Sequence, residues 1–384
     1  MKDTIRKLRD FFLLRLLLPV LYRAHVTQEK KLVIIALGAI GDYVLLRNWF
    51  LALRNDPNYH DWDITVVGNR VWREIAEGYD DQIVDQWIWI DKKKLKDSPR
   101  YLFQVMDSLA KGHYAVCLSS AYTREALIDC LVLSTCAAQK IGQFGEAENI
   151  QRDQKVVTDR YYTKLYDFGI RTMFEYRRNR LFFESFLGHE LPEPAPSLTE
   201  NTDLERIVSS RSYAVIFPGA SHENRRWDPK KFSKIAAYIF QRYHLPVLIC
   251  GSKDERYLFS EIAHSTPPEI CFDMTGKALP EFIGLLRKAE IVVTNDTAAL
   301  HLSAAIKTPV VGLYNGRHFG RFSPYPPEYG LRIAHLYSSK IEKRRTDTNY
   351  LLDKYRTKTD VSIQDIEPVA VERAIDAVLG NPLR

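Results

Sequence analysis

The sequence predicts two α/β domains in tandem, each built on an open parallel sheet flanked by helices. Short apolar runs alternate with amphipathic helical patterns along most of the chain, and such alternation is typical of parallel strands joined by crossover helices. The length of 384 residues exceeds one ordinary domain core, and 46% of the residues are hydrophobic. The chain therefore has enough apolar surface for two cores of usual size.

We expect five consecutive segments. They are a basic and apolar helix at 1–30, a first α/β domain at 31–190, a linker at 191–211, a second α/β domain at 212–337, and a charged loop with a C-terminal helix that packs back at 338–384. The linker prediction depends on the run Leu-Pro-Glu-Pro-Ala-Pro-Ser at 191–197. Closely spaced prolines without a hydrophobic pattern are typical of connections between domains.

The first domain begins with a strand, a glycine turn and a helix. The apolar run 32–37 precedes the turn Gly38-Ala39-Ile40-Gly41-Asp42, and a helical pattern covers 43–54. Further apolar runs predict strands at 64–67, 83–90 and 114–118, and helical patterns lie at 71–76 and 101–110.

The second domain repeats this alternation. Strands are predicted at 213–217, 246–250, 291–294 and 310–314, with helices at 231–243, 254–263, 279–289, around 302–305 and at 369–379. Because the carboxyl ends of parallel strands meet at one edge of a sheet, we predict a ligand-binding cleft between the domains that faces the strand ends.

The composition limits the classes of ligand. A formal net charge of +6 is compatible with acidic ligands such as nucleotides. The sequence has no dense Lys/Arg stripe with interleaved aromatic residues, so we expect no nucleic-acid partner. The five cysteines are scattered without a C-x-x-C spacing, and we interpret them as buried thiols without a metal.

The N-terminus carries an apolar run at 11–22 after several basic residues. Arg15 interrupts the run, which is shorter than the ~20 residues of a membrane-spanning helix and lacks a small-residue cleavage site. We expect an uncleaved amphipathic helix that lies on the inner membrane surface or against the protein, and favour the membrane.

The turn Asn295-Asp296-Thr297-Ala298-Ala299-Leu300-His301 joins a predicted strand to a predicted helix. Such a junction directs the backbone N–H groups of a helix N-terminus into one crevice, where they bind phosphate. Asp296 and Thr297 are also ordinary helix caps, and His301 fits a buried helix position. The combination of carboxylate, hydroxyl and imidazole favours a ligand site.

A second polar loop, at 217–227, follows the first strand of the second domain and contains two adjacent arginines. Arg225 or Arg226 could neutralise a diphosphate. Trp227 could anchor the loop or stack on a base. Two solvated arginines without a ligand are the alternative.

The glycine turn at 38–42 lacks the spacing of the G-x-G-x-x-G fingerprint, so NAD binding is disfavoured. One interpretation is a tight strand-to-helix turn in which Asp42 is a helix N-terminal acid. The other is that Gly38 and Gly41 allow close approach of a ligand while Asp42 projects into the cleft as a general base.

Two further loops at predicted strand ends are weaker candidates. Asn315-Gly316-Arg317-His318-Phe319-Gly320-Arg321 could close over a sugar or phosphate through Arg317 and Arg321. The loop at 119–124 could present Arg124 to an acceptor.

Taken together, these motifs resemble glycosyltransferase family 9, the lipopolysaccharide heptosyltransferases, over about Lys31 to Leu379. The resemblance rests on motifs in matching order and spacing: Leu37–Asp42, Phe217–Ser221 with Arg225-Arg226-Trp227, Gly276 with Leu279, and Asn295–His301 followed by Ala304-Ala305.

The resemblance implies a GT-B fold, in which two Rossmann-like domains face a central cleft. It further implies an ADP-activated heptose donor on the second domain, a lipid-linked saccharide acceptor on the first, and inversion at the anomeric carbon. Asp42 falls on the proposed catalytic base, and Arg225 on a basic residue, often Lys, that contacts the donor. The expected donor-binding residues are Gly219, Ser221, Arg225, Arg226, Asp296, Thr297, Ala298, Ala299 and His301.

The same resemblance implies a cytoplasmic enzyme, peripheral at the inner face of the bacterial inner membrane. We expect no cofactor and no metal, since no Asp-x-Asp motif accompanies the donor turn and cationic side chains can replace a metal. The chain departs from the family at Ala298, where Gly is common, and in its longer N-terminal extension. Alternatives are a GT-B glycosyltransferase with another nucleotide sugar or with a capsule or protein acceptor, and a non-catalytic nucleotide- or glycan-binding module.

Overall fold

The computed structural model describes residues 17–24, 27, 29–169, 172–205 and 212–380. The predicted helix at 1–30 therefore lies largely outside the described residues. The chain divides into two compact units, the first made of Met1–Ile170 and Arg178–Pro192, the second of Arg171–Arg177 and Glu193–Arg384. The predicted linker spans the last boundary, whereas residues 171–177, assigned from sequence to the first domain, group with the second unit.

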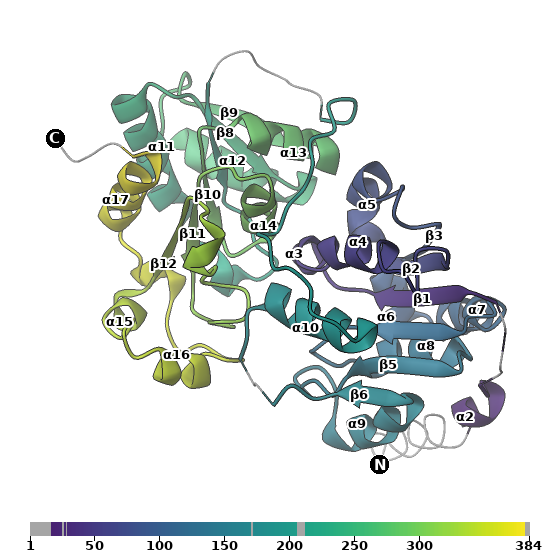
Figure 1. The fold of residues 1–384 in the computed structure, drawn as a ribbon. Coiled ribbons are helices and arrows are strands. Elements are labelled where there is room, and N and C mark those ends of the chain that lie inside the picture. The colour runs from purple at the N-terminus through teal and green to yellow at the C-terminus, as the bar shows by residue number, and fades with distance from the viewer. Residues whose placement is uncertain (1–16, 25–26, 28, 170–171, 206–211, 381–384) are drawn as a thin grey trace. The chain divides into compact units, whose positions relative to one another are not determined.

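The first unit contains a six-stranded, wholly parallel sheet in the order β3-β2-β1-β4-β5-β6 (Figure 1). Its strands are β1 Lys31–Ala36, β2 Asp63–Asn69, β3 Gln86–Ile90, β4 Val116–Ser119, β5 Gln139–Gln143 and β6 Lys164–Tyr166. The central strands β1 and β4 are almost completely buried. This burial explains their continuous apolar runs.

The α-helices described in the first unit are α2 Leu18–Leu21, α3 Ile40–Val44, α4 Asn48–Arg54, α5 Arg73–Tyr79, α6 Lys92–Asp97, α7 Pro99–Ala110, α8 Ala126–Ser134, α9 Arg152–Thr158 and, from Arg178 onward, α10 Glu175–Leu187. The helix predicted at 43–54 starts earlier and is split into α3 and α4. Consequently Gly41 and Asp42 belong to the first turn of α3, not to a loop before it.

The second unit contains another six-stranded parallel sheet, in the order β12-β11-β10-β7-β8-β9 (Figure 1). Its strands are β7 Ala214–Phe217, β8 Val247–Gly251, β9 Cys271–Thr275, β10 Ile291–Asn295, β11 Val310–Tyr314 and β12 Ile333–Tyr337. The two edge strands, β9 and β12, were not predicted from the sequence.

The helices of this unit are α11 Pro229–Tyr243, α12 Arg256–His264, α13 Leu279–Lys288, α14 Ala298–Ala305, α15 Ser339–Glu342, α16 Thr348–Lys354 and α17 Pro368–Leu379, with one-turn 3₁₀ helices η4 Glu223–Arg225, η5 Lys253–Glu255, η6 Pro327–Tyr329 and η7 Ile363–Asp365. The segment at 338–359 was expected as an exposed loop. It instead forms α15 and α16, because Ile341, Leu351 and Tyr355 are buried.

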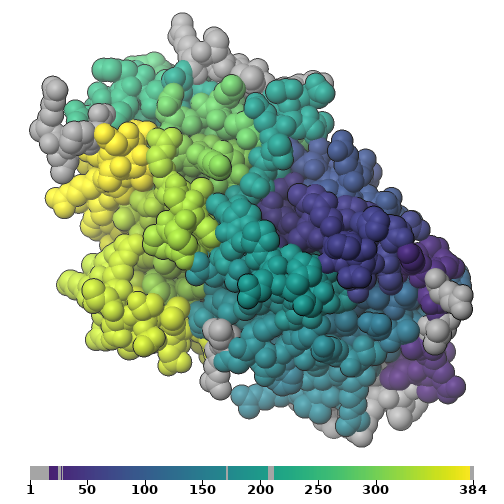
Figure 2. Space-filling model, viewed as in Figure 1, coloured from purple at the N-terminus to yellow at the C-terminus, as the bar shows by residue number. Residues whose placement is uncertain are grey.

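The last helix, α17, ends at Leu379, and Gly380 caps it in the left-handed conformation. It contacts α11, β11 and β12 of the same unit, and its yellow atoms lie directly against the green ones in the space-filling view (Figure 2). Val371 and Ile375 of α17 join the core around Trp227 and Phe232. Within the described part of the chain, no helix is long and apolar enough to cross a membrane.

Candidate functional site

The centre of the second sheet is a topological switch point. Neighbouring strands β10 and β7 pair in parallel, with Thr294 opposite Phe217, and the chain leaves them toward opposite sides of the sheet. Ligands of open α/β sheets bind at the carboxyl ends of such strands. The loop at 218–228 leaves β7 here, and the turn at 296–297 leaves β10.

Asn295 joins these two segments. Its fully buried side chain donates from Nδ2 to the Pro218 carbonyl at 2.7 Å and accepts from the Trp227 backbone N–H at 3.2 Å. One amide therefore fixes both ends of the arginine loop relative to the donor turn predicted from the sequence. An Ala side chain here would leave buried backbone groups unpaired, which is costly.

The turn after β10 provides an anion-attracting helix start. Thr297 is the N-cap of α14, with extended backbone, and its hydroxyl accepts from the Ala299 N–H at 3.3 Å. Ala298 is the first helical residue and is not in the left-handed region, so its methyl group causes no backbone strain. The N-terminus of α14 carries the partial positive charge of the helix dipole.

Arg225 lies over this turn. Its Nη1 atom is 3.7 Å from Oδ2 of Asp296, and the two side chains are 18% and 10% exposed. Burial raises the pKa of Asp296, while the nearby charges of Arg225 and His318 oppose that rise. The turn thus combines one carboxylate with two basic side chains and a helix N-terminus. His318 was part of a loop noted in the sequence but was not selected there.

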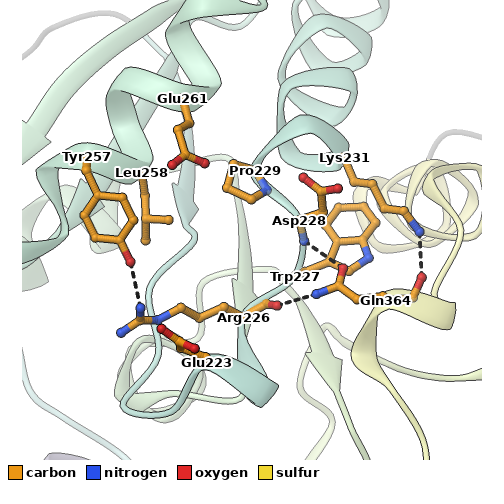
Figure 3. Close-up of a pocket in the computed structure, with 10 residues that line it drawn as sticks. All are labelled: Glu223, Arg226, Trp227, Asp228, Pro229, Lys231, Tyr257, Leu258, Glu261 and Gln364. Atoms are coloured by element: carbon orange, nitrogen blue, oxygen red, sulfur yellow. Dashed lines mark hydrogen bonds between the residues drawn. The ribbon is translucent and has the colours of Figure 1, made fainter.

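Arg226 faces elsewhere. Its Nε donates to the Ala220 carbonyl at 2.9 Å, and its Nη1 donates to the Tyr257 hydroxyl at 2.7 Å (Figure 3). Trp227 is fully buried, with its indole N–H donating to the Ile366 carbonyl at 3.0 Å. Trp227 therefore anchors the loop, and stacking on a base, the other sequence-based interpretation, is wrong for this conformation.

Gly219 and Ser221 lie in the same loop, Ser221 exposed and Gly219 buried. A Cβ atom on Gly219 would lie 2.2 Å from Oε1 of Glu255. The Glu255 carboxylate accepts from the Ser252 N–H and hydroxyl at the start of η5, both at 2.9 Å. Glycine at 219 therefore leaves room for the Glu255 carboxylate, and a larger residue would displace that side chain.

His301 is buried in α14. Its Nδ1 pairs with the Tyr325 hydroxyl at 2.7 Å, and burial lowers its pKa to about 4. Nearby, His335 Nε2 accepts from the Tyr325 N–H at 3.0 Å, and burial lowers the pKa of His335 to about 3. Both imidazoles are therefore neutral supports beneath the turn at neutral pH.

This burial predicts a pH-dependent stability. The His301 imidazole ordinarily titrates near 6.5 but stays neutral in the folded chain down to about pH 4. Between these values the unfolded chain binds the extra proton, so the free energy of unfolding falls as the pH falls. We expect His301 to account for a loss of about 2 kcal/mol between pH 7 and pH 5.

Chemical denaturation at both pH values, on the wild type and the His301→Gln variant, measures this loss. The variant is expected to have a shallower pH dependence by that amount. His264→Gln, at an exposed position at the end of α12, is the matched control. An unchanged pH dependence in His301→Gln would contradict the assignment.

The loop at 315–321 makes its hydrogen bonds and ion pair with other residues of the second unit. Asn315 Nδ2 donates to the Asn224 carbonyl at 3.2 Å, which ties this loop to the arginine loop. Arg321 is 8% exposed and its Nε donates to Glu175 at 2.8 Å. The expectation that Arg321 closes over a ligand is therefore not met, because a buried ion pair satisfies it. Arg317 is half-buried, and its contact with a ligand stays a prediction.

In the first unit, the ends of β1 and β4 flank the corresponding switch point. Asp42 is half-buried in the first turn of α3, and its Oδ2 accepts from the Ala39 N–H at 2.8 Å. A Cβ atom on Gly38 would lie 2.5 Å from Cβ of Asp42. Glycine thus lets the carboxylate fold back over the turn, as the helix-acid interpretation of Asp42 requires.

Arg124 does not face an acceptor. It is 2% exposed, and its guanidinium donates to both carboxylate oxygens of Asp129, at 3.0 and 2.8 Å, and to Asp159 at 3.0 Å. It also lies 4.5 Å from the centre of the Tyr162 ring. The prediction that Arg124 contacts an acceptor is therefore wrong, because Asp129 and Asp159 of the same unit already pair with its guanidinium.

Two six-stranded parallel sheets with these connections define a GT-B fold. The chain aligns with the crystal structure of the glycosyl transferase family 9 protein from Veillonella parvula DSM 2008 (TM-score 0.71, 17% identity, 94% of this chain and 100% of that one). It also aligns with E. coli ADP-heptose lipopolysaccharide heptosyltransferase II (TM-score 0.66, 17% identity, 91% and 98%). At these identities the alignments establish the fold alone.

The family model "Glycosyltransferase family 9 (heptosyltransferase)" matches residues 170–351. This match covers just under half of the chain, and over these residues the chain is similar to glycosyltransferase family 9. This segment contains the Arg225 loop and the Asp296 turn but not Asp42, and it is shorter than the resemblance described from the sequence.

Curated relatives with heptosyltransferase names match the chain over part of their length. Lipopolysaccharide heptosyltransferase 3 of Escherichia coli K12 is 34% identical over 114 residues, which cover 29% of this chain and 33% of the relative. Lipopolysaccharide heptosyltransferase 2 of the same strain is 25% identical over 229 residues, which cover 58% and 62%. The chain thus spans between a third and two thirds of these relatives.

Proposed function

We propose that the protein is an inverting glycosyltransferase that moves a heptose from an ADP-activated donor to a lipopolysaccharide core or another lipid-linked glycan. The observation that carries the proposal is the position of Arg225 over Asp296 and the N-terminus of α14, inside the family-matched segment. This combination suits a nucleoside diphosphate, since a cationic fork and helix N–H groups both bind phosphate oxygens.

On this proposal, the bond between the anomeric carbon and the diphosphate oxygen breaks during transfer, and negative charge develops on the departing diphosphate. Arg225 and the N-terminus of α14 stabilise that charge through fixed dipoles in a partly buried turn. Because Arg225 supplies positive charge at the leaving group, we propose that transfer needs neither a metal nor another cofactor.

Asp42 is the proposed general base. Its carboxylate would take the proton from the acceptor hydroxyl as that oxygen attacks the anomeric carbon. Attack on the face opposite the departing diphosphate inverts the anomeric configuration. The proposal is supported by the position of Asp42 at the switch point of the first sheet, where polar side chains at strand ends bind ligands.

We propose a lipid-linked acceptor met at the inner membrane surface. In α2, Leu18 is 5% exposed and joins the core of the first unit, whereas Val20 and Leu21 are 59% and 58% exposed. Two neighbouring exposed apolar side chains at the end of an apolar N-terminal run are compatible with insertion between lipid headgroups.

A two-part assay tests the donor, acceptor and membrane proposals. Thermal unfolding with ADP, UDP or GDP measures nucleotide preference, and we expect ADP to stabilise most; at one hundred times its dissociation constant a ligand adds about 2.7 kcal/mol. Transfer from ADP-heptose is then followed with a lipid-linked core acceptor in anionic vesicles and with the same glycan freed of lipid, each with and without EDTA.

We expect product with inverted configuration, faster transfer on the vesicles, and no effect of EDTA. Preferential binding of UDP or GDP would assign another donor. Nucleotide binding without transfer to any acceptor would favour a non-catalytic module, and equal rates on both acceptors would remove the membrane proposal.

A further inference from the structure

A pocket of about 410 Å³ lies beside the arginine loop of the second unit (Figure 3). Arg226, Gln364, Tyr257 and Lys231 line it, together with the carboxylates of Glu223 and Glu261. The hydrogen bonds drawn there connect four elements: the loop after β7, helices α11 and α12, and the turn η7 near the C-terminus. The pocket therefore lies next to Arg225 in the chain, since Glu223 and Arg226 line it.

Gln364 brackets the backbone directly after Arg225. Its Nε2 donates to the Arg226 carbonyl at 2.7 Å, and its Oε1 accepts from the Asp228 N–H at 3.0 Å. Lys231 in turn donates to the backbone carbonyl of Gln364 at 2.6 Å. A side-chain amide that satisfies both a donor and an acceptor two residues apart fixes the course of that backbone.

The Arg226 side chain closes the loop from the same side. It connects the Ala220 carbonyl, at the start of the loop, to the Tyr257 hydroxyl of α12. On the other side of Arg225, Asn315 holds the Asn224 carbonyl at 3.2 Å. The carbonyls immediately before and after Arg225 are therefore both held by side chains from distant parts of the second unit.

We propose that Gln364 is a positioning residue for Arg225, assisted by Tyr257 through Arg226. Gln364 acts through the backbone and holds the one-turn 3₁₀ helix η4, so that the Arg225 guanidinium stays over Asp296 and the N-terminus of α14. The proposal deepens the proposed function and rests on it, since Arg225 is taken as the diphosphate contact. Preorganised donors lose less entropy and reorganise less during reaction, which favours both binding and turnover.

A double-mutant cycle on ADP affinity tests the proposal with the full chain. The variants are Gln364→Ala, Arg225→Ala and the double variant, measured by calorimetry with ADP. Loss of a hydrogen-bonded bracket is expected to weaken ADP binding by about five- to tenfold in Gln364→Ala. In the Arg225→Ala background the same change is expected to have no further effect, because the residue acts through Arg225.

Tyr257→Phe removes one hydroxyl and is expected to give a smaller loss, also absent when Arg225 is alanine. If Gln364→Ala fails to fold, the same double-mutant cycle with Arg225→Ala is measured with Tyr257→Phe instead. Gln241→Ala, at an exposed position near the end of α11, is the matched control and leaves ADP affinity unchanged.

Losses that add in the double variant would overturn the inference, because a general structural role acts with or without Arg225. An unchanged ADP affinity in both Gln364→Ala and Tyr257→Phe, with Arg225→Ala weakened, would also overturn it while leaving the proposed function intact. Absence of ADP binding by the wild type would instead refute the proposed donor and this inference together.

Discussion

Replacing Asp42 by alanine or asparagine is expected to lower the turnover of sugar transfer by about 10²- to 10⁴-fold, the usual contribution of a general base. Asparagine keeps the size and one acceptor oxygen of the side chain but cannot take a proton. Affinity for ADP is expected to stay unchanged in both variants, because the proposed donor residues belong to the second unit. Turnover is measured at saturating donor, and ADP affinity by calorimetry.

The test must separate the effect of each Asp42 substitution on folding stability from its effect on turnover. Asp42 accepts the Ala39 N–H at the start of α3, and loss of such a cap costs about 0.5–2 kcal/mol. Asp91 makes the reciprocal bond at a helix start of the first unit: it is the N-cap residue of α6 and accepts the Lys94 N–H at 3.0 Å. Asp91→Ala is therefore the matched control: it is expected to lose similar stability and keep its turnover. Near wild-type turnover in both Asp42 variants would mean that another group is the base.

The fold was largely predictable because its central strands are buried on both faces. Strands such as β1 and β10 are continuous apolar runs, and glycine or polar turns follow them. The missed elements lack that signal. Edge strand β9 mixes exposed Phe272 and half-buried Asp273 into a short segment. Helix α8 is buried on nearly every side, with seven of its nine residues buried, so it has no clear amphipathic period.

Parts of the site were less predictable, because the partners of its arginines come from distant sequence. Arg225 and Arg226 are equivalent by sequence, yet Arg226 is held by Ala220 and by Tyr257 of α12. Arg321 pairs with Glu175, which lies 146 residues away in the chain. A charged residue at a strand end is therefore a weak predictor of ligand binding until its internal partners are known. The turn at 295–301 was better predicted because strand, cap and helix are adjacent in the chain.

Replacing Arg225 by alanine is expected to weaken ADP binding and to lower turnover, with turnover falling by about 10²- to 10³-fold, as for removal of one preorganised donor at a developing negative charge. Arg225→Lys keeps the charge without the planar fork and is expected to fall between the wild type and Arg225→Ala. ADP calorimetry and the donor-saturated transfer assay measure the two effects. Arg332→Ala, at an exposed position beside β12, removes the same charge from the same unit and is expected to change neither.

The loss in Arg225→Ala is further expected to depend on pH because of Asp296. Burial raises the pKa of this carboxyl, and the Arg225 charge opposes the rise. Without Arg225 the pKa rises further, so Asp296 becomes neutral at a higher pH. A neutral Asp296 repels the diphosphate less than a carboxylate does. The affinity lost in Arg225→Ala should therefore be larger at pH 8 than at pH 6. If the loss of ADP affinity is the same at both pH values, the charge of Asp296 does not act on the diphosphate. If Arg225→Ala binds ADP as tightly as the wild type does, Arg225 does not contact the donor.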